Sequence, residues 1–324
     1  MLNHKLMLSG VLLAAAAAGI SVSTAHATVL ASDSAANYTS GFSGNAGTGF
    51  GAWNVNFAYT GPSGAGGGGG GFIGTNAGIT SPSTPAFDIY VYPGTGGDTG
   101  LNTDITTATR SFNSALTAGQ TFTTDLSLDN GQTSTSVANT NPSTADSNMG
   151  FALLDSSGKV LFSMICFGGG EYWASDGTNG GAYFEPDSGN ILYNYHADDT
   201  FAFSLLSSTG NYSLTAGGNI GGGSPTTFTG SINMATGGPT QVQYIDNNGG
   251  NGSDVQWSNM SITSTPVPEP AMLGFAALGG AALLMTKRSH RRKVKVCTRR
   301  DTSRAINRGD EATSPRFFSA RTYK

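Results

Sequence analysis

Hydrophobic and polar residues alternate along the chain between residues 50 and 262, in short runs that turn residues separate. Phe122, Leu126 and Leu128, for example, fall on one side of such a run, and the Thr, Asp and Ser residues between them fall on the other. A period of two is the pattern of a strand with one buried face. No helical period of useful length occurs within residues 28–266, so the pattern predicts an all-β domain.

The alternating runs predict a series of short strands. Clusters of Gly, Asn, Asp and Ser separate the runs, and residues 155–158 (DSSG) are typical of a hairpin turn. Many short strands with regular turns indicate two packed sheets. We therefore expect an antiparallel two-sheet sandwich with strands at 53–59, 87–92, 105–112, 121–128, 149–154, 159–167, 191–195, 201–205, 211–214, 226–232, 241–245 and 255–262.

Composition also favours strands and turns over helices. The 324 residues include 48 glycines, and only 11% of the residues are charged; glycine is a poor helix former. Residues 28–49 and the glycine run at 64–71 are low in complexity, so we expect flexible linker or loop in both. The glycine run lacks the Lys-Ser/Thr pair that follows a phosphate-binding loop.

The N-terminus carries the pattern of an export signal. Lys5 precedes an apolar stretch at residues 6–20, and Ala25-His26-Ala27 follows with the small residues of a cleavage site. The sequence therefore predicts a signal peptide at residues 1–27, helical in its apolar part. The mature chain is expected to begin with the residue that follows.

A second apolar stretch lies near the other end of the chain. Residues 271–286 carry no charge, and as a helix they would reach about 24 Å, somewhat less than the hydrocarbon core of a bilayer. The basic cluster that follows directly consists of Lys287, Arg288, Arg291, Arg292 and Lys293. The positive-inside rule then predicts a single transmembrane helix with its basic end in the cytoplasm and everything before it on the far side.

The motif Pro268-Glu269-Pro270 precedes this apolar stretch directly. Its prolines keep the motif extended and out of the helix. The order of motif, apolar helix and basic cluster at residues 266–293 resembles the PEP-CTERM sorting signal of Gram-negative bacteria. That resemblance implies recognition by an exosortase, a membrane cysteine protease-transpeptidase, in species that make extracellular polysaccharide. Family tails usually end after the basic cluster, whereas residues 294–324 add a basic segment that we expect to be disordered.

Two stretches of the middle region resemble secreted bacterial modules with a concanavalin A-like jelly roll. They are TRSFNSALTAGQTFTTDLSLDNG at 109–131 and MGFALLDSSGKVLF at 149–162. The resemblance implies a jelly-roll sandwich, which we place at residues 50–265. Lectins, laminin-G-like domains and glucanases share this fold, so it does not select a function.

Charge is distributed unevenly along the chain. Residues 28–270 include 17 acidic residues and 2 basic ones, Arg110 and Lys159, whereas residues 287–324 include 3 acidic and 13 basic residues. An exported domain this acidic repels phosphate backbones, so nucleic acid is not an expected partner. The 2 cysteines cannot build a disulfide framework, and Cys166, which lies in an apolar run, is expected to be buried.

Few residues point to catalysis. His196 is the single histidine outside the terminal segments, and no Ser or Cys nucleophile motif accompanies it. Glycoside hydrolysis needs two carboxylates across a cleft. Glu185 and Asp187 match the start of the E-x-D-x-x-E pattern of one glucanase group, but the second Glu is missing and Pro186 is typical of a turn. A non-enzymatic role is favoured, with a glycoside hydrolase or lyase as the alternative.

Tyr172 and Trp173 are the candidate carbohydrate-binding residues. Asp176 and Asn179 lie nearby, so this segment combines aromatic faces with a carboxylate and an amide. The alternative is that these aromatic side chains are buried in the core.

Asp246, Asn248 and Asp254 are candidate calcium ligands, because they form a dense cluster of the hard oxygen groups that calcium prefers. The spacing of an EF-hand is absent, and a hydrogen-bonded Asx turn is the alternative. The combined prediction is an exported cell-surface or extracellular-matrix protein that an exosortase sorts and that binds exopolysaccharide. An adhesin or fibre subunit is the third class.

The predicted topology is tested by reporter fusions in a Gram-negative host. Alkaline phosphatase fused after Ile262 is expected to be active, because its disulfides form only outside the cytoplasm. The same reporter fused after Lys293 is the matched control and is expected to be inactive. Activity in the second fusion alone contradicts the predicted orientation.

Overall fold

The computed structural model describes residues 26–39, 41–42, 44–59, 67–74, 85–92, 104–129, 147–167, 171–176, 183–184, 198–218, 225–248 and 253–265. The chain divides into two units, Met1–Val267 and Pro268–Lys324, and the described residues all belong to the first. In this part of the chain the elements are strands and one 3-10 helix, η1 (Ala35–Asn37). None of its helices has the length and apolar character that crossing a bilayer requires. The helices predicted at 6–20 and 271–286 lie outside the described residues.

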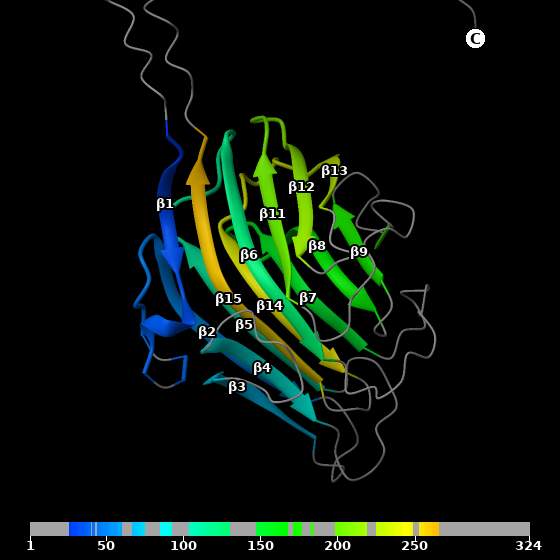
Figure 1. Ribbon diagram of the computed structural model, residues 1–324. Helices are drawn as coiled ribbons and strands as arrows, with labels where there is room; N and C mark the ends of the chain where they lie inside the picture. Colours follow the sequence, from blue (N-terminus) through cyan, green and yellow to red (C-terminus); the bar gives the residue numbers. More distant parts are fainter. Residues whose placement is uncertain are drawn as a thin grey trace, which may run out of the picture. The chain divides into compact units, whose positions relative to one another are not determined.

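The strands form two antiparallel sheets, which Figure 1 shows as two layers. Sheet A has the order β13-β12-β11-β6-β15-β4-β3, and β1 also pairs with β15. Its strands are β1 (Thr28–Asp33), β3 (Gly68–Gly74), β4 (Ala86–Tyr92), β6 (Gln120–Asp129), β11 (Asp199–Leu205), β12 (Asn211–Gly218), β13 (Thr226–Ser231) and β15 (Ser253–Ser264).

Sheet B has the order β10-β9-β8-β7-β14-β5-β2. Its strands are β2 (Phe50–Tyr59), β5 (Asp104–Phe112), β7 (Ser147–Leu154), β8 (Val160–Phe167), β9 (Glu171–Asp176), β10 (Tyr183–Phe184) and β14 (Gln241–Asn248). The predicted all-β fold with two antiparallel sheets is confirmed. The alternating runs coincide with β2, β4 to β8 and β11 to β15, while the run at 191–195 lies outside the described residues. The periodicity did not identify β1, β3, β9 or β10.

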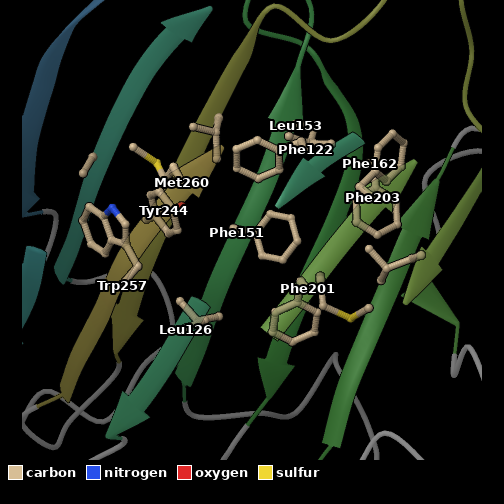
Figure 2. Close-up of a cluster of buried hydrophobic side chains, with 14 of the residues drawn as sticks. Phe122, Leu126, Phe151, Leu153, Phe162, Phe201, Phe203, Tyr244, Trp257 and Met260 are labelled. Atoms are coloured by element: carbon tan, nitrogen blue, oxygen red, sulfur yellow. The ribbon is translucent and has the colours of Figure 1, made fainter. Parts of the chain in front are cut away.

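Aromatic rings fill the space between the two sheets, as Figure 2 shows. Tyr244 of sheet B stacks on Trp257 of sheet A, with ring centroids 4.0 Å apart and planes 8° apart. Farther along, the ring of Phe151 contacts those of Phe122 and Phe201 at 6.4 Å and 5.4 Å. Full burial of one such side chain stabilises the fold by about 1.5 to 3 kcal/mol. The inward residues of the alternating runs therefore hold the sheets together.

The hairpin predicted at residues 155–158 joins β7 to β8. Asp155 Oδ1 accepts hydrogen bonds from Ser157 Oγ (2.6 Å), Ser157 N (2.8 Å) and Lys159 N (3.0 Å), and Thr236 Oγ1 donates to Oδ2 at 2.6 Å. These bonds, led by those from the Ser157 and Thr236 side chains, lower the pKa of Asp155 below its usual range. Gly158 has φ 82°, a conformation that glycine adopts without steric cost.

The segment predicted as a linker at residues 28–49 differs from that expectation. Its first residues form β1, in which Thr28 pairs with Ser264 and Asp33 pairs with Met260. Because β1 is antiparallel to β15, the start of β1 and the end of β15 lie side by side, as Figure 1 shows. Low sequence complexity here reflects small residues in an edge strand. The sandwich thus begins at β1 rather than at residue 50.

A buried ion pair joins this N-terminal segment to sheet B. Arg110 of β5 is fully buried and donates through Nη1 to Asp33 Oδ2 at the end of β1. Its other nitrogens donate to the Gly51 carbonyl oxygen (2.8 Å) and to Asn45 Oδ1 (2.6 Å). Tyr38 also donates to Asp33 Oδ2, at 3.0 Å. One guanidinium thus contacts the end of β1, the start of β2 and the segment between them.

Arg110 also lies against two aromatic rings. Its Cζ atom is 5.1 Å from the centroid of Phe50 and 5.0 Å from that of Trp53, an arrangement that adds cation–π attraction. Burial lowers the pKa of Arg110 to about 10. The guanidinium therefore stays charged at neutral pH, and removing one partner would leave the other charge buried.

Replacing either partner of this pair is expected to destabilise the exported domain. Arg110→Met or Asp33→Leu should each lower the free energy of unfolding by about 3 to 5 kcal/mol, because a buried charge loses its counter-ion. The double variant should lose less than the sum of the two, since both charges are gone. Urea unfolding of residues 28–265 measures these changes. Single-variant losses below about 1 kcal/mol would show that the pair behaves like an exposed one.

Candidate functional site

The structure places Tyr172 and Asp176, both predicted to bind carbohydrate, in the core. Tyr172 is 1% exposed and donates its hydroxyl to Asp199 Oδ2 at 3.2 Å. Asp176 is 3% exposed and accepts a hydrogen bond from the Tyr212 hydroxyl at 3.0 Å. Burial raises the pKa of Asp199 to about 8. The hydrogen bonds of Tyr172 and Asp176 join β9 to the facing sheet. Both side chains are therefore buried in the core and are no longer candidates for contact with a ligand. Asn179 lies outside the described residues.

Trp173 lies on the other face of β9, because successive residues of a strand point to opposite sides. Its half-buried side chain packs against Ile165, as does Ile245, on the outer face of sheet B. Its Nε1 atom has no hydrogen-bond partner among the described residues. The structure therefore separates Trp173 from Tyr172 and Asp176, which the sequence analysis grouped together.

Of the three candidate calcium ligands, the structure describes the side chains of Asp246 and Asp254. Asp246 is fully buried and accepts a hydrogen bond from Ser253 Oγ at 2.5 Å. Asp254 follows Ser253 in β15 and so points to the opposite face of sheet A. The side chain of Asn248 lies outside the described set. No group of three or more His, Cys, Asp and Glu side chains that could hold a metal occurs among the described residues.

The remaining candidates fall into two groups. Cys166 is buried, as its apolar run predicted. The sorting motif at 268–270, the basic cluster, and Glu185, Asp187 and His196 all lie outside the described residues.

An aromatic surface that the sequence analysis did not identify lies on the outer face of sheet A, at the edge formed by β3 and β4 (Figure 1). In β4, Phe87 and Ile89 are fully buried in the core. The alternate residues Asp88, Tyr90 and Tyr92 therefore point to the outer face. The rings of Tyr90 and Tyr92 have centroids 6.2 Å apart and planes 12° apart, so they lie nearly parallel.

Glycines of β3 make room for these rings. Gly68 pairs with Tyr92, and Gly70 pairs with Tyr90. A Cβ atom at Gly68 would lie 2.0 Å from Tyr92 Cζ, so the ring occupies the space of the missing side chain. Phe72 of the same strand extends the aromatic row, with its ring 6.0 Å from that of Tyr90. Tyr92 is 52% exposed despite this packing.

Polar groups of β15 border the aromatic row. Gln256 pairs with Asp88 in the sheet, and its Nε2 atom donates to Asp88 Oδ2 at 2.5 Å. Asp254 pairs with Tyr90 and contacts Asp88 through its side chain. We call the group of Phe72, Asp88, Tyr90, Tyr92, Asp254 and Gln256 the tyrosine surface.

Asp88 is the electrostatically unusual member of the tyrosine surface. It is 0% exposed, and its Oδ1 atom has no hydrogen-bond partner among the described residues. Burial, and next the charge of Asp254, raise the pKa of Asp88 well above its usual range. Asp88 therefore keeps its proton at neutral pH, and Asp254 carries the negative charge that borders the rings.

Comparison with known proteins gives only distant structural likenesses. No family model and no curated protein matches the chain. Lectin II from Ulex europaeus is 8% identical with a TM-score of 0.36, and the match covers 65% of this chain and 93% of the lectin. A structure described as endo-acting O-glycanases of the human gut microbiota gives 9% identity, a TM-score of 0.43, and coverage of 74% and 100%. A sialidase gives 10% identity, a TM-score of 0.36, and coverage of 60% of this chain and 17% of the sialidase.

The names of these proteins describe sugar binding or glycan cleavage. Their TM-scores and identities are too low to carry an activity or a ligand to this chain. The candidate site is therefore argued from the geometry of the tyrosine surface alone.

Replacing Asp88 by an amide of the same shape is expected to stabilise the protein at neutral pH. The folded state holds the Asp88 proton more tightly than the unfolded chain, so stability is full below about pH 4 and falls as pH rises toward the raised pKa. Asp88→Asn removes the part of this fall that Asp88 causes and can still accept from Gln256, while the buried Asp199, whose pKa is also raised, keeps its own part.

Urea unfolding across pH 2 to 9 measures the change. Asp155→Asn is the control with the opposite sign, because the lowered pKa of Asp155 contributes stability above about pH 4 that is lost as pH falls. An unchanged fall above pH 4 in Asp88→Asn would show that Asp88 is ionised in the folded state.

Proposed function

We propose that this chain is an exported cell-surface protein that binds polysaccharide on the tyrosine surface without cleaving it. The observation that carries the proposal is the pair of nearly parallel rings of Tyr90 and Tyr92 on an outer sheet face, with Tyr92 52% exposed and Asp254 alongside. Pyranose rings present C–H groups on their flat faces, which pack against aromatic rings. The carboxylate of Asp254 at the border binds the hydroxyls and fixes the orientation of the sugar.

Binding is favoured over hydrolysis by the burial of Asp88. Hydrolysis needs two carboxyl groups that reach opposite sides of one glycosidic bond. Asp88 is 0% exposed, so of the two contacting carboxyls only Asp254 borders the place where a sugar would lie. A carboxyl of raised pKa beside an ionised one is nevertheless an arrangement that hydrolases use. A glycoside hydrolase or lyase is therefore the second candidate, and release of product is its test.

The proposal extends to fold family and export. We place the sandwich among concanavalin A-like jelly rolls, on its interleaved order, in which β6 lies between β11 and β15. A signal peptide at residues 1–27 and a sorting signal at 266–293, read by an exosortase, would deliver it to the surface of a Gram-negative cell. Support comes from the pairing of Thr28 with Ser264, because it brings the predicted cleavage site and the predicted sorting motif to the same end of the sandwich.

Removing the exposed ring tests the proposed function. Tyr92→Ala is expected to weaken binding to the preferred oligosaccharide on a glycan array at least about tenfold, because the sugar loses one stacking face. Leu206→Ala is the matched control, since Leu206 is 56% exposed directly after β11 and outside the tyrosine surface. The array is run with and without calcium. Equal loss in both variants, or shortened oligosaccharide after incubation, contradicts the proposal.

A further inference from the structure

The charges of the exported domain restrict the class of polysaccharide that suits the tyrosine surface. Residues 28–265 contain two basic side chains, Arg110 and Lys159. Arg110 is fully buried in its ion pair with Asp33. Lys159 lies in the turn between β7 and β8 of sheet B, while the tyrosine surface belongs to sheet A. A carboxylated or sulfated polysaccharide would therefore meet no lysine or arginine of residues 28–265 on this surface.

The groups that border the rings suit a positive charge instead. Asp254 contacts Asp88, and the charge of Asp254 is one cause of the raised pKa of Asp88. Oδ1 of Asp88 is buried and lacks a hydrogen-bond partner within the described part of the chain. A cation held at Asp254 would pair with the charge of that carboxylate beside the protonated Asp88.

The aromatic faces favour the same kind of group. An ammonium ion over a tyrosine ring is attracted by about 0.5 to 2 kcal/mol, depending on how far it is desolvated. Tyr90 is the ring directly opposite Asp254 in the sheet, so one ammonium group could contact both. A neutral hexose offers its hydroxyls to this pair but no charge.

We propose that the tyrosine surface binds an amine-bearing polysaccharide, a polymer of amino sugars that lack their acetyl groups, with an ammonium group held between Tyr90 and Asp254. This inference rests on the proposed function and names the ligand class of the same site. The sugar rings stack on Tyr92 and Phe72, and the carboxylate of Asp254 selects the charge.

The test compares four oligosaccharides of equal length on the full chain in detergent micelles. They are a hexamer of glucosamine, a hexamer of N-acetylglucosamine, cellohexaose and a hexamer of alginate, titrated by calorimetry at about pH 6. The glucosamine hexamer is expected to bind at least tenfold more tightly than the two neutral hexamers. Its advantage should shrink with added salt and as the pH rises above the pKa of the sugar amine.

Variants assign the preference to residues. Asp254→Asn should reduce the advantage of the glucosamine hexamer at least about fivefold, while binding of the neutral hexamers weakens by a smaller factor, because the amide can still hydrogen-bond their hydroxyls. Asp125→Asn is the matched control, because Asp125 is a part-exposed carboxylate of β6 that is bonded to Thr200 and Asn259, and it should keep the advantage. Tyr92→Ala should weaken the binding of every hexamer that binds this surface. Binding to the basic tail would be unchanged in Tyr92→Ala, so the variant distinguishes the two.

The outcomes separate the two proposals. If the neutral or alginate hexamers bind as tightly as the glucosamine hexamer and depend on Tyr92, the amine preference is wrong and polysaccharide binding stands. If Asp254→Asn leaves the advantage unchanged, the placement of the ammonium group is wrong. If no hexamer shows binding that depends on Tyr92, the proposed function fails and this inference fails with it.

Discussion

The packing of aromatic rings between the two sheets is the interaction on which the rest of this structure depends. Tyr244 and Trp257 stack across the sheets, and a chain with 11% charged residues and 2 cysteines has few other means of holding them. Because hydrophobic burial is roughly proportional to apolar area, large inward rings supply most of the stabilisation. A shift of one residue in any strand would turn its rings to solvent, so the core also determines the register. The core therefore also determines which residues of each strand point outward.

The N-terminal segment relies on a different interaction. It has few large apolar side chains, and Arg110 ties it to the sandwich through hydrogen bonds to Asp33, Asn45 and the Gly51 carbonyl. An ion pair in the interior is costly to desolvate, so its value lies in positioning one segment rather than in net stability. The position it secures brings Thr28 beside Ser264.

Strand β15 relates the tyrosine surface to the two ends of the domain. Asp254, near its start, pairs with Tyr90, and Ser264, at its end, pairs with Thr28. Ten residues at about 3.3 Å each separate the two points by about 30 Å. In the proposed anchored form, the chain leaves the sandwich toward the sorting signal at the end of β15, and the tyrosine surface lies near the start of that strand. This arrangement suits a protein that is held at a membrane and binds a polymer outside it.

The sequence alone determined the fold class and most strands, because alternation with a period of two is local and can be read from neighbouring residues. The turn at Asp155 was equally local. Which surface a strand faces depends on the opposing sheet, and this is why Tyr172 and Asp176, plausible as ligand residues, lie in the core. The sequence predicted a loop for the glycine run, because no local pattern around Gly68 and Gly70 indicates that tyrosine rings pack over them. Only the tertiary structure brought β3, β4 and β15 side by side, because backbone pairing across some 170 residues joins side chains that no local pattern connects.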